Sequence, residues 1–254
     1  MSLLLRDRRV LLAAGISLLE WLFVAGAAVF GSADQFPMVL AVVIVASAVQ
    51  FYALFYRRRS PLAKAQQLFR EGRFQEAVDE LQSHLSDGDV QALTLLGNTY
   101  RQMGQLVDSE KTLREAVLLQ PDNPFPLYGL GRTLLVQGKF AEAANWIQKA
   151  LDGGGQKVLR AELALAHYLN KDAEQAGQAA EKAARLLQME AYRVLMVNYI
   201  LHQTRNNSKA VNMMARVADA LPYWHAEAER FAATPYGTIL MGEVNHLKSL
   251  LPKE

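Results

Sequence analysis

Few residues of this 254-residue sequence stand at spacings that support catalysis. Its histidines, at positions 84, 167, 202, 225 and 246, form neither a His-Glu-x-x-His nor a His-x-His pattern. No serine lies in a Gly-x-Ser-x-Gly turn, and cysteine is absent, which excludes thiolate nucleophiles and Cys-ligated zinc. We therefore expect no enzyme activity, no catalytic residues, no cofactor and no bound metal.

Two glycine-rich segments are better explained by packing than by nucleotide binding. Gly129-Leu130-Gly131 lies inside an expected helix without a strand before it, unlike a dinucleotide-binding loop. Gly153-Gly154-Gly155 lacks the Lys-Ser/Thr of a phosphate-binding loop and is expected to end a helix. A small-molecule substrate is therefore not expected.

Glu20 is the one ionisable side chain within an apolar stretch, residues 10–30. An unpaired carboxylate in the hydrocarbon of a bilayer costs about 3 kcal/mol or more, so a partner for Glu20 is expected. Ser47 and Gln50 lie at a comparable depth in a second apolar stretch, residues 36–56. Two interpretations stay open. Glu20 docks onto a partner transmembrane protein or relays protons, or it is neutral and hydrogen-bonded to Gln50 or Ser47.

The two apolar stretches predict a transmembrane helical hairpin within residues 1–59. Each has 21 residues, which as an α-helix crosses a hydrocarbon core of about 30 Å. Arginines stand before the first stretch and after the second, whereas the short turn between them carries Asp34 and no cation. We therefore expect an integral membrane protein with two spans and with both termini and the following domain in the cytoplasm. A cleaved signal peptide is the alternative, which would place the rest of the chain outside.

The charge of the remaining sequence argues against nucleic-acid binding. Residues 60–254 carry nearly equal numbers of basic and acidic side chains, and the overall formal charge is only +2. A nucleic-acid-binding domain needs a concentrated basic surface for its phosphate contacts. No nucleic-acid partner is therefore expected.

A glycine-containing turn recurs along the soluble part, at Gly72, Gly104 and Gly138, with spacings of 32 and 34 residues. A period of 34 is that of the tetratricopeptide motif W-x2-L-G-x2-Y…A-x3-F…P. Residues 90–123 match it through Leu93, Leu96, Gly97, Tyr100, Ser109, Leu113, Ala116 and Pro121, and residues 124–156 through Leu127, Leu130, Gly131, Leu134, Phe140, Ala143, Ile147 and Ala150. These two copies resemble the tetratricopeptide repeat family.

Weaker copies flank these two. Residues 60–89 keep most of the pattern, whereas residues 157–189 keep small and apolar positions, assigned to Leu165, Ala166 and Leu169, but lack the turn glycine. Residues 190–254 are expected to form a divergent helix pair and C-terminal capping helices. The expected fold is all-α: a transmembrane hairpin of helices at about 10–30 and 36–56, then a right-handed α-solenoid of tetratricopeptide-like helix pairs over residues 60–189.

The resemblance implies a concave groove that binds a peptide or helix of a protein partner, including a membrane protein. The first helix of each pair contributes side chains at motif positions 2, 5, 9 and 12. The candidate groove residues are Asn98, Arg101, Tyr128, Arg132, Arg160 and His167. Arginine suits bidentate contact with a carboxylate, and tyrosine offers a flat apolar surface. The alternatives are an ordinary solvated helix face, a partner on the convex side, and residues 190–251 filling the groove.

These expectations lead to one functional hypothesis and one alternative. The first is a membrane-anchored scaffold or adaptor for protein–protein interaction, acting in the assembly or stabilisation of a membrane complex. The alternative is a permanent accessory subunit of such a complex, docked through the transmembrane hairpin.

Overall fold

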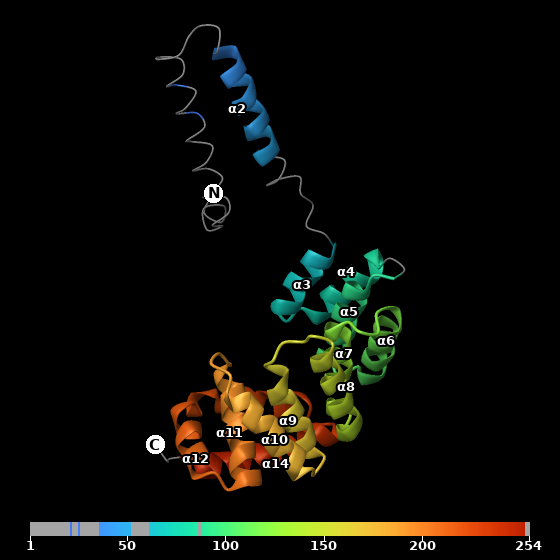
Figure 1. Cartoon of the computed structure of the whole chain (residues 1–254). Helices are drawn as coiled ribbons and strands as arrows, with labels where there is room; N and C mark the ends of the chain where they lie inside the picture. Colours follow the sequence, from blue (N-terminus) through green and yellow to red (C-terminus); the bar gives the residue numbers. More distant parts are fainter. Residues whose placement is uncertain (1–20, 22–24, 26–35, 52–60, 86–87, 252–254) are drawn as a thin grey trace. The chain divides into compact units, whose positions relative to one another are not determined.

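The structure is a computed structural model that describes residues 21, 25, 36–51, 61–85 and 88–251 (Figure 1). The chain divides into two units, residues 1–60 and residues 61–254. Every regular element among the described residues is a helix, and the helices can be followed by colour from α2 in blue to α14 in red.

The first unit contributes one described helix, α2 (Phe36–Phe51), of 16 residues. Apolar side chains lie on its surface over most of its length, with Met38 73% exposed and Val45 62% exposed. None of the described helices is both long and apolar enough to cross a bilayer. The first expected span at 10–30, with Glu20, lies outside the described residues apart from Trp21 and Ala25, as does the end of the second span. Ser47 is half-buried, and the side chain of Gln50 is also outside the described part.

The second unit is a succession of helix pairs, which confirms the all-α repeat architecture expected from the sequence. Each helix packs against the next one along the chain, and short turns join the two helices of a pair. The pairs are α3 (Pro61–Arg70) with α4 (Phe74–His84), α5 (Val90–Gln102) with α6 (Leu106–Leu119), α7 (Pro124–Val136) with α8 (Phe140–Asp152), α9 (Leu159–Leu169) with α10 (Ala173–Ala184), and α11 (Ala191–Arg205) with α12 (Ser208–Arg216). The 3-10 helix η3 (Ala218–Ala220), α13 (Leu221–Arg230) and α14 (Pro235–Leu250) follow.

The turn inside a pair requires a residue with positive φ. Gly138 has φ 82° and lies where the Gly138 N–H donates to Leu135 O and the Lys139 N–H donates to Leu134 O. The same pair of hydrogen bonds recurs in the fourth pair, where Lys171 takes the glycine position with φ 64°. A side chain in this backbone region costs roughly 1–2 kcal/mol. The fourth turn therefore keeps its geometry without the glycine. The sequence motif is harder to recognise there, but the helix pair still forms.

Small residues bring the two helices of a pair into close contact. A Cβ on Gly97 would lie 2.5 Å from Leu113 Cγ, and one on Gly131 would lie 2.7 Å from Ile147 Cγ1. Leu113 and Ile147 are both fully buried, and burying such a side chain is worth about 1.5–3 kcal/mol. The motif glycines of the second and third copies thus permit the interhelical contact on which each pair depends.

The C-terminal pair folds back onto the repeats instead of extending their stack. Helix α13 contacts α11, and α14 contacts α7, three helix pairs earlier in the chain. The Trp224 indole N–H donates to Tyr192 O over 2.7 Å, and a Cβ on Gly138 would lie 2.9 Å from Pro235 Cβ. A single apolar core consequently runs from Leu113 to Leu247, and α13 and α14 belong to it.

Candidate functional site on the inner surface of the repeats

The first helices of the pairs, α5, α7, α9 and α11, form what we call the inner surface. Arg132 of α7 lies on this surface and is only 9% exposed. Its guanidinium donates to Glu162 Oε2 of α9 over 2.7 Å and to Glu227 Oε1 of α13 over 2.8 Å. One arginine therefore joins two first helices of the repeats to the C-terminal pair.

Arg193 of α11 extends this network. Its Nε donates to Glu162 Oε1 over 3.2 Å, and its Nη1 lies 2.6 Å from Glu190 Oε2. We call Arg132, Glu162, Arg193 and Glu227 the ion cluster. Its side chains are 6% to 13% exposed, so water screens their charges little. The ion cluster links α7, α9, α11 and α13 through hydrogen-bonded charges.

The surroundings of the ion cluster shift the pKa of Arg132 and of a neighbouring phenol, Tyr236. Burial opposes the charge of the Arg132 guanidinium, but Glu162, Tyr236 and Glu227 outweigh it and raise the pKa of Arg132 well above its usual range. Burial and the charge of Glu227 raise the pKa of Tyr236 well above its usual range. Tyr236 is fully buried, and its hydroxyl has no hydrogen-bond partner within the described part of the chain. Arg132 is therefore charged and Tyr236 is neutral at neutral pH.

Arg101 of α5 is a buried cation of a different kind. It is 8% exposed, and its Nη1 donates to Asn98 Oδ1 over 2.7 Å and to Gly129 O over 3.4 Å. No carboxylate among residues 61–85 and 88–251 lies within ion-pair distance of it. Burial, and next the charge of Arg132, lower the pKa of Arg101 to about 10, so it stays charged at neutral pH. A positive charge without a directly paired carboxylate is thus held beside the ion cluster.

Next to Arg101 the inner surface is open. Phe125 lies one helical turn before Tyr128 and Gly129 on α7 and is 69% exposed. Asn98 and Tyr128 are half-buried. Burial, and next Glu162, raise the pKa of Tyr128 to about 12, so it is a neutral phenol. We call Asn98, Arg101, Phe125 and Tyr128 the open patch, which offers one cation, one amide and two aromatic rings.

The structure separates the six candidate groove residues into three places. Asn98, Arg101 and Tyr128 lie in the open patch. Arg132 lies in the ion cluster, where its guanidinium is occupied by carboxylates of this chain. Arg160 and His167 are not brought to either place. They line a separate cavity together with residues of α8 and α10.

The cause is the register of the fourth repeat. The first half of the motif fits Arg160-x2-Leu163-Ala164-x2-His167, so Arg160 and His167 stand where the third copy has Leu127 and Leu134. Those positions pack between helices and do not face the inner surface. Glu162, one of the residues that does reach the inner surface from α9, was not among the sequence candidates.

Sequence reasoning also missed Arg193 and Glu227. Both lie beyond the recognisable repeats, in α11 and α13, and Glu227 is separated from Arg132 by 95 positions. No periodic signal connects them. The sequence offered one clue, the alternative that residues 190–251 fill the groove. Helix α13 lies beside Arg132, which agrees with this alternative for the part of the inner surface formed by α7, α9 and α11.

Chemically, the side chains of the open patch are of types suited to binding. Among the described residues, no group of three or more histidine, aspartate or glutamate side chains is placed to hold a metal ion. The side chains of the open patch are a cation, an amide, a phenol and a phenyl ring. They can bind a carboxylate and an apolar side chain placed next to each other.

Comparison with known proteins supports a repeat fold. Residues 94–157, within α5 to α8 and the turn that follows, match the family described as tetratricopeptide repeat. Solved structures of MamA are similar: a crystal structure of MamA has 19% identity and a TM-score of 0.51, covering 61% of this chain and 93% of that one. MamA 41-end from Desulfovibrio magneticus RS-1 has 18% identity and a TM-score of 0.52, covering 61% of this chain and 90% of that one. MamA of AMB-1 has 19% identity and a TM-score of 0.52, covering 63% and 97%. A comparison with curated proteins finds no match.

Proposed function

We propose that this chain, which carries tetratricopeptide repeats at residues 94–157, is a membrane-tethered scaffold that binds a segment of a partner protein. The observation that carries the proposal is Arg101, a buried cation with no ion-paired carboxylate in the described part of the chain. It donates to Gly129 O, and the exposed ring of Phe125 lies one helical turn before Gly129 on α7. A buried charge without a counter-charge is unfavourable, and a carboxylate from a partner would relieve it. The segment we expect therefore carries an acidic side chain next to an apolar one.

The C-terminal pair limits where this segment binds. Helix α13 covers the inner surface around Arg132, and Trp224 and Ala228 of α13 are 3% and 0% exposed within the main core. Displacing α13 would expose this apolar surface and the ion cluster together. The partner is therefore expected at the open patch, where the first turn of α7 exposes Phe125. The end of α5 is in contact with α13, because Arg230 donates a hydrogen bond to Gln102 Oε1.

Tethering to a membrane is the second part of the proposal. It rests on the two apolar stretches of the sequence, on the arginines that flank them, and on the apolar side chains exposed along α2. A tether confines the repeats to a layer near the bilayer and raises the effective concentration of any membrane-bound partner. We propose that the scaffold serves the assembly or stabilisation of a membrane complex and has no catalytic activity of its own.

A permanent accessory subunit is the other candidate function. The observation that favours it is Glu20, a carboxylate in the middle of an apolar stretch. Such a group is a docking point when a partner transmembrane helix supplies the hydrogen bond. A subunit of this kind would purify with its complex at a fixed ratio in mild detergent, and Glu20→Leu would release it, whereas a scaffold would be found with partners only while complexes assemble.

Photo-crosslinking tests the open patch directly. A photoreactive phenylalanine analogue at position 125 in the full-length chain should crosslink to a partner, identified by mass spectrometry. Replacing Arg101→Met in the same protein should reduce this crosslink about tenfold, because a charge-assisted hydrogen bond contributes roughly 1.5–3 kcal/mol. A photoreactive residue at Leu187, which is fully exposed elsewhere, is the matched control. Equal crosslinking of the same protein from both positions would contradict the assignment.

A further inference from the structure

The cavity that contains Arg160 and His167 lies between α8, α9 and α10 and has a volume of about 460 Å³. Its floor is apolar, formed in part by Leu163 and Ala179, which are both 6% exposed. Its rim is polar and carries Lys157, Arg160 and Lys182. The cavity is therefore large enough for one or two amino-acid side chains.

The sequence explains why a cavity is present in this repeat. Arg160 and His167 take the motif positions that Leu127 and Leu134 occupy in the third copy, 33 residues earlier. Leu127 and Leu134 are 2% and 0% exposed and fill the space between helices. Arginine and histidine prefer to keep their polar ends in water, so this space stays open in the fourth repeat.

The charges around the cavity are not balanced. No carboxylate within the described ranges lies at ion-pair distance from Lys157, Arg160 or Lys182. The acidic side chain that lines the cavity, Asp152, accepts a hydrogen bond from Gln148 Nε2 over 2.8 Å. Three cations thus surround the cavity against one carboxylate.

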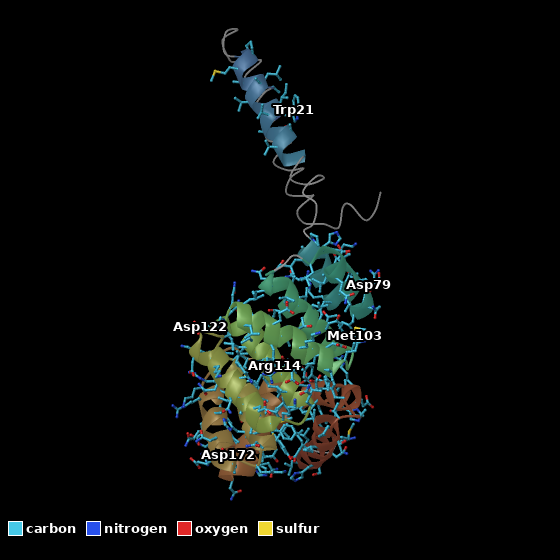
Figure 2. All side chains as sticks on the ribbon, turned by 90° about the vertical axis from the view of Figure 1, so that its right-hand side faces the viewer. Trp21, Asp79, Met103, Arg114, Asp122 and Asp172 are labelled. Carbon is cyan, nitrogen blue, oxygen red and sulfur yellow. The ribbon has the colours of Figure 1, made fainter. Side chains whose placement is uncertain are left out.

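His167 does not add a fourth cation at neutral pH. Its Nδ1 lies 3.8 Å from Asp172 Oδ2, and Asp172, labelled in Figure 2, also caps α10 by accepting the N–H of Gln175. Burial lowers the pKa of His167, and the charge of Asp172 opposes this without overcoming it. His167 is therefore a neutral hydrogen-bonding group in the cavity wall.

We propose that this cavity is a second binding site, which receives neighbouring acidic side chains of a partner protein. Arg160 can bind a carboxylate bidentately, Lys157 and Lys182 supply further positive charge, and the floor contacts the methylene groups of a glutamate. The proposal rests on the proposed function in one respect, that the ligand is part of a protein. The site is distinct from the open patch and needs none of its residues.

Several backbone N–H groups around the cavity are already hydrogen-bonded within this chain. Phosphate sites at loops and helix starts use free backbone N–H groups. Here the N–H groups of Gly154, Gly155, Leu159 and Arg160 all donate to carbonyls of this chain. These four N–H groups are therefore not free to bind an anion, whereas the cationic side chains are spread around a cavity with an apolar floor.

The test uses the full-length chain in detergent and a fluorescent peptide that contains a run of glutamates between Gly-Ser segments. Fluorescence anisotropy should show binding, and the same peptide with glutamines should not bind. Arg160→Leu restores the residue type of Leu127 at this motif position and should weaken binding about tenfold. The double variant Lys157→Gln with Lys182→Gln should weaken peptide binding at least as much. It changes only exposed side chains, so the test does not depend on whether Arg160→Leu folds.

The matched control removes two positive charges elsewhere, by Lys209→Gln with Arg216→Gln in α12. This variant should bind the glutamate peptide as the wild type does, and an equal loss would overturn the proposal in favour of unspecific attraction. Failure of the wild type to bind, or displacement of the peptide by an equal concentration of inorganic phosphate, would also overturn it. Phe125→Ser should leave peptide binding unchanged. This variant therefore distinguishes a failure of the proposal for the open patch from a failure of the proposal for this cavity.

Discussion

The guanidinium of Arg132 makes two short contacts to carboxylates of different helices, at 2.7 Å and 2.8 Å, where little water reaches. Replacing a buried ion pair as a whole by apolar side chains is often neutral for stability, but removing one partner leaves a charge buried and unpaired. Glu227 has Arg132 as its ion-pair partner in the described structure, whereas Glu162 also contacts Arg193. The two glutamates are therefore not equivalent.

The first prediction follows from this difference. Glu227→Gln should lower the free energy of unfolding by about 3 kcal/mol, because it removes the carboxylate that attaches α13 to α7. The midpoint of urea unfolding of the full chain, followed by circular dichroism, measures the loss. Glu76→Gln is the control, since its ion pair with Arg73 is exposed to water and its loss should change the stability much less. Equal effects of the two variants would show that the ion cluster does not stabilise the fold.

The second prediction concerns Gly138, where two constraints meet. Gly104 and Gly138 have φ of 77° and 82°, so alanine is strained at both, by roughly 1 kcal/mol. At Gly138 a Cβ would also lie 2.9 Å from Pro235 Cβ, whereas nothing lies within 4 Å of a Cβ on Gly104. Gly138→Ala should therefore lower the thermal midpoint more than Gly104→Ala does.

This comparison isolates one contact, because both substitutions carry the same backbone strain. Gly138→Ala should cost less in a Pro235→Gly background than in the wild type, because glycine at position 235 removes the Cβ that the new methyl group would meet. Equal melting temperatures of the two glycine variants would show that the contact between Pro235 and Gly138 does not affect stability.

At the scale of the helices, the repeats differ in how many neighbours each has. Helices α3 and α4 share a small apolar cluster with α5, separate from the main core. Helix α11 buries seven side chains and contacts α9, α10, α12 and α13. Repeat proteins gain stability from the contacts between neighbouring units, so a terminal pair with one neighbour opens first.

The third prediction is a gradient of hydrogen exchange. Amides in α3 and α4 should exchange faster than those in α11 by about one to two orders of magnitude, because opening α11 disrupts the main core. Mass spectrometry of the exchanged full chain measures it. Equal protection of α3 and α11 would mean that the repeats open as a single unit.

How much of this arrangement the sequence predicts depends on the element. The second and third copies are predictable because Gly97, Gly131 and the turn glycines are fixed by close contact and by φ. The fourth copy is harder to place, because it keeps the fold with Lys171 in the glycine position and with polar side chains at two apolar motif positions. Assigning its register from Leu165 and Ala166, two residues away from the Leu163-Ala164 match, misplaced Arg160 and His167. Glu162 falls at motif position 6, outside the four groove positions, even in the corrected register. The contact between α13 and Arg132 has no signal in the local sequence, because it joins residues 95 positions apart through tertiary packing.

At the scale of the molecule, the inner surface has two parts with different roles. Part of it is covered by the C-terminal pair of the same chain, which completes the main core, and part of it stays open at Phe125. A solenoid whose own C-terminal helices cover part of its inner surface offers a shorter groove to a partner. The cavity at Arg160 then supplies additional binding surface outside the groove.

The last prediction concerns the side of the membrane on which the repeats lie. The sequence has no cysteine, so a single introduced cysteine is the only thiol and its labelling is unambiguous. Leu187→Cys reports on the repeats, since residue 187 is fully exposed, and Asp34→Cys reports on the expected turn between the spans.

A membrane-impermeant maleimide should label Asp34→Cys in intact cells and Leu187→Cys only in inverted vesicles. The physical reason is the placement of arginines at both outer ends of the apolar stretches, which retains those ends in the cytoplasm. Labelling of Leu187→Cys in intact cells would reverse the orientation and favour export of the repeats. Labelling of both variants in the supernatant after an alkaline wash would show instead that the chain is not held by the bilayer.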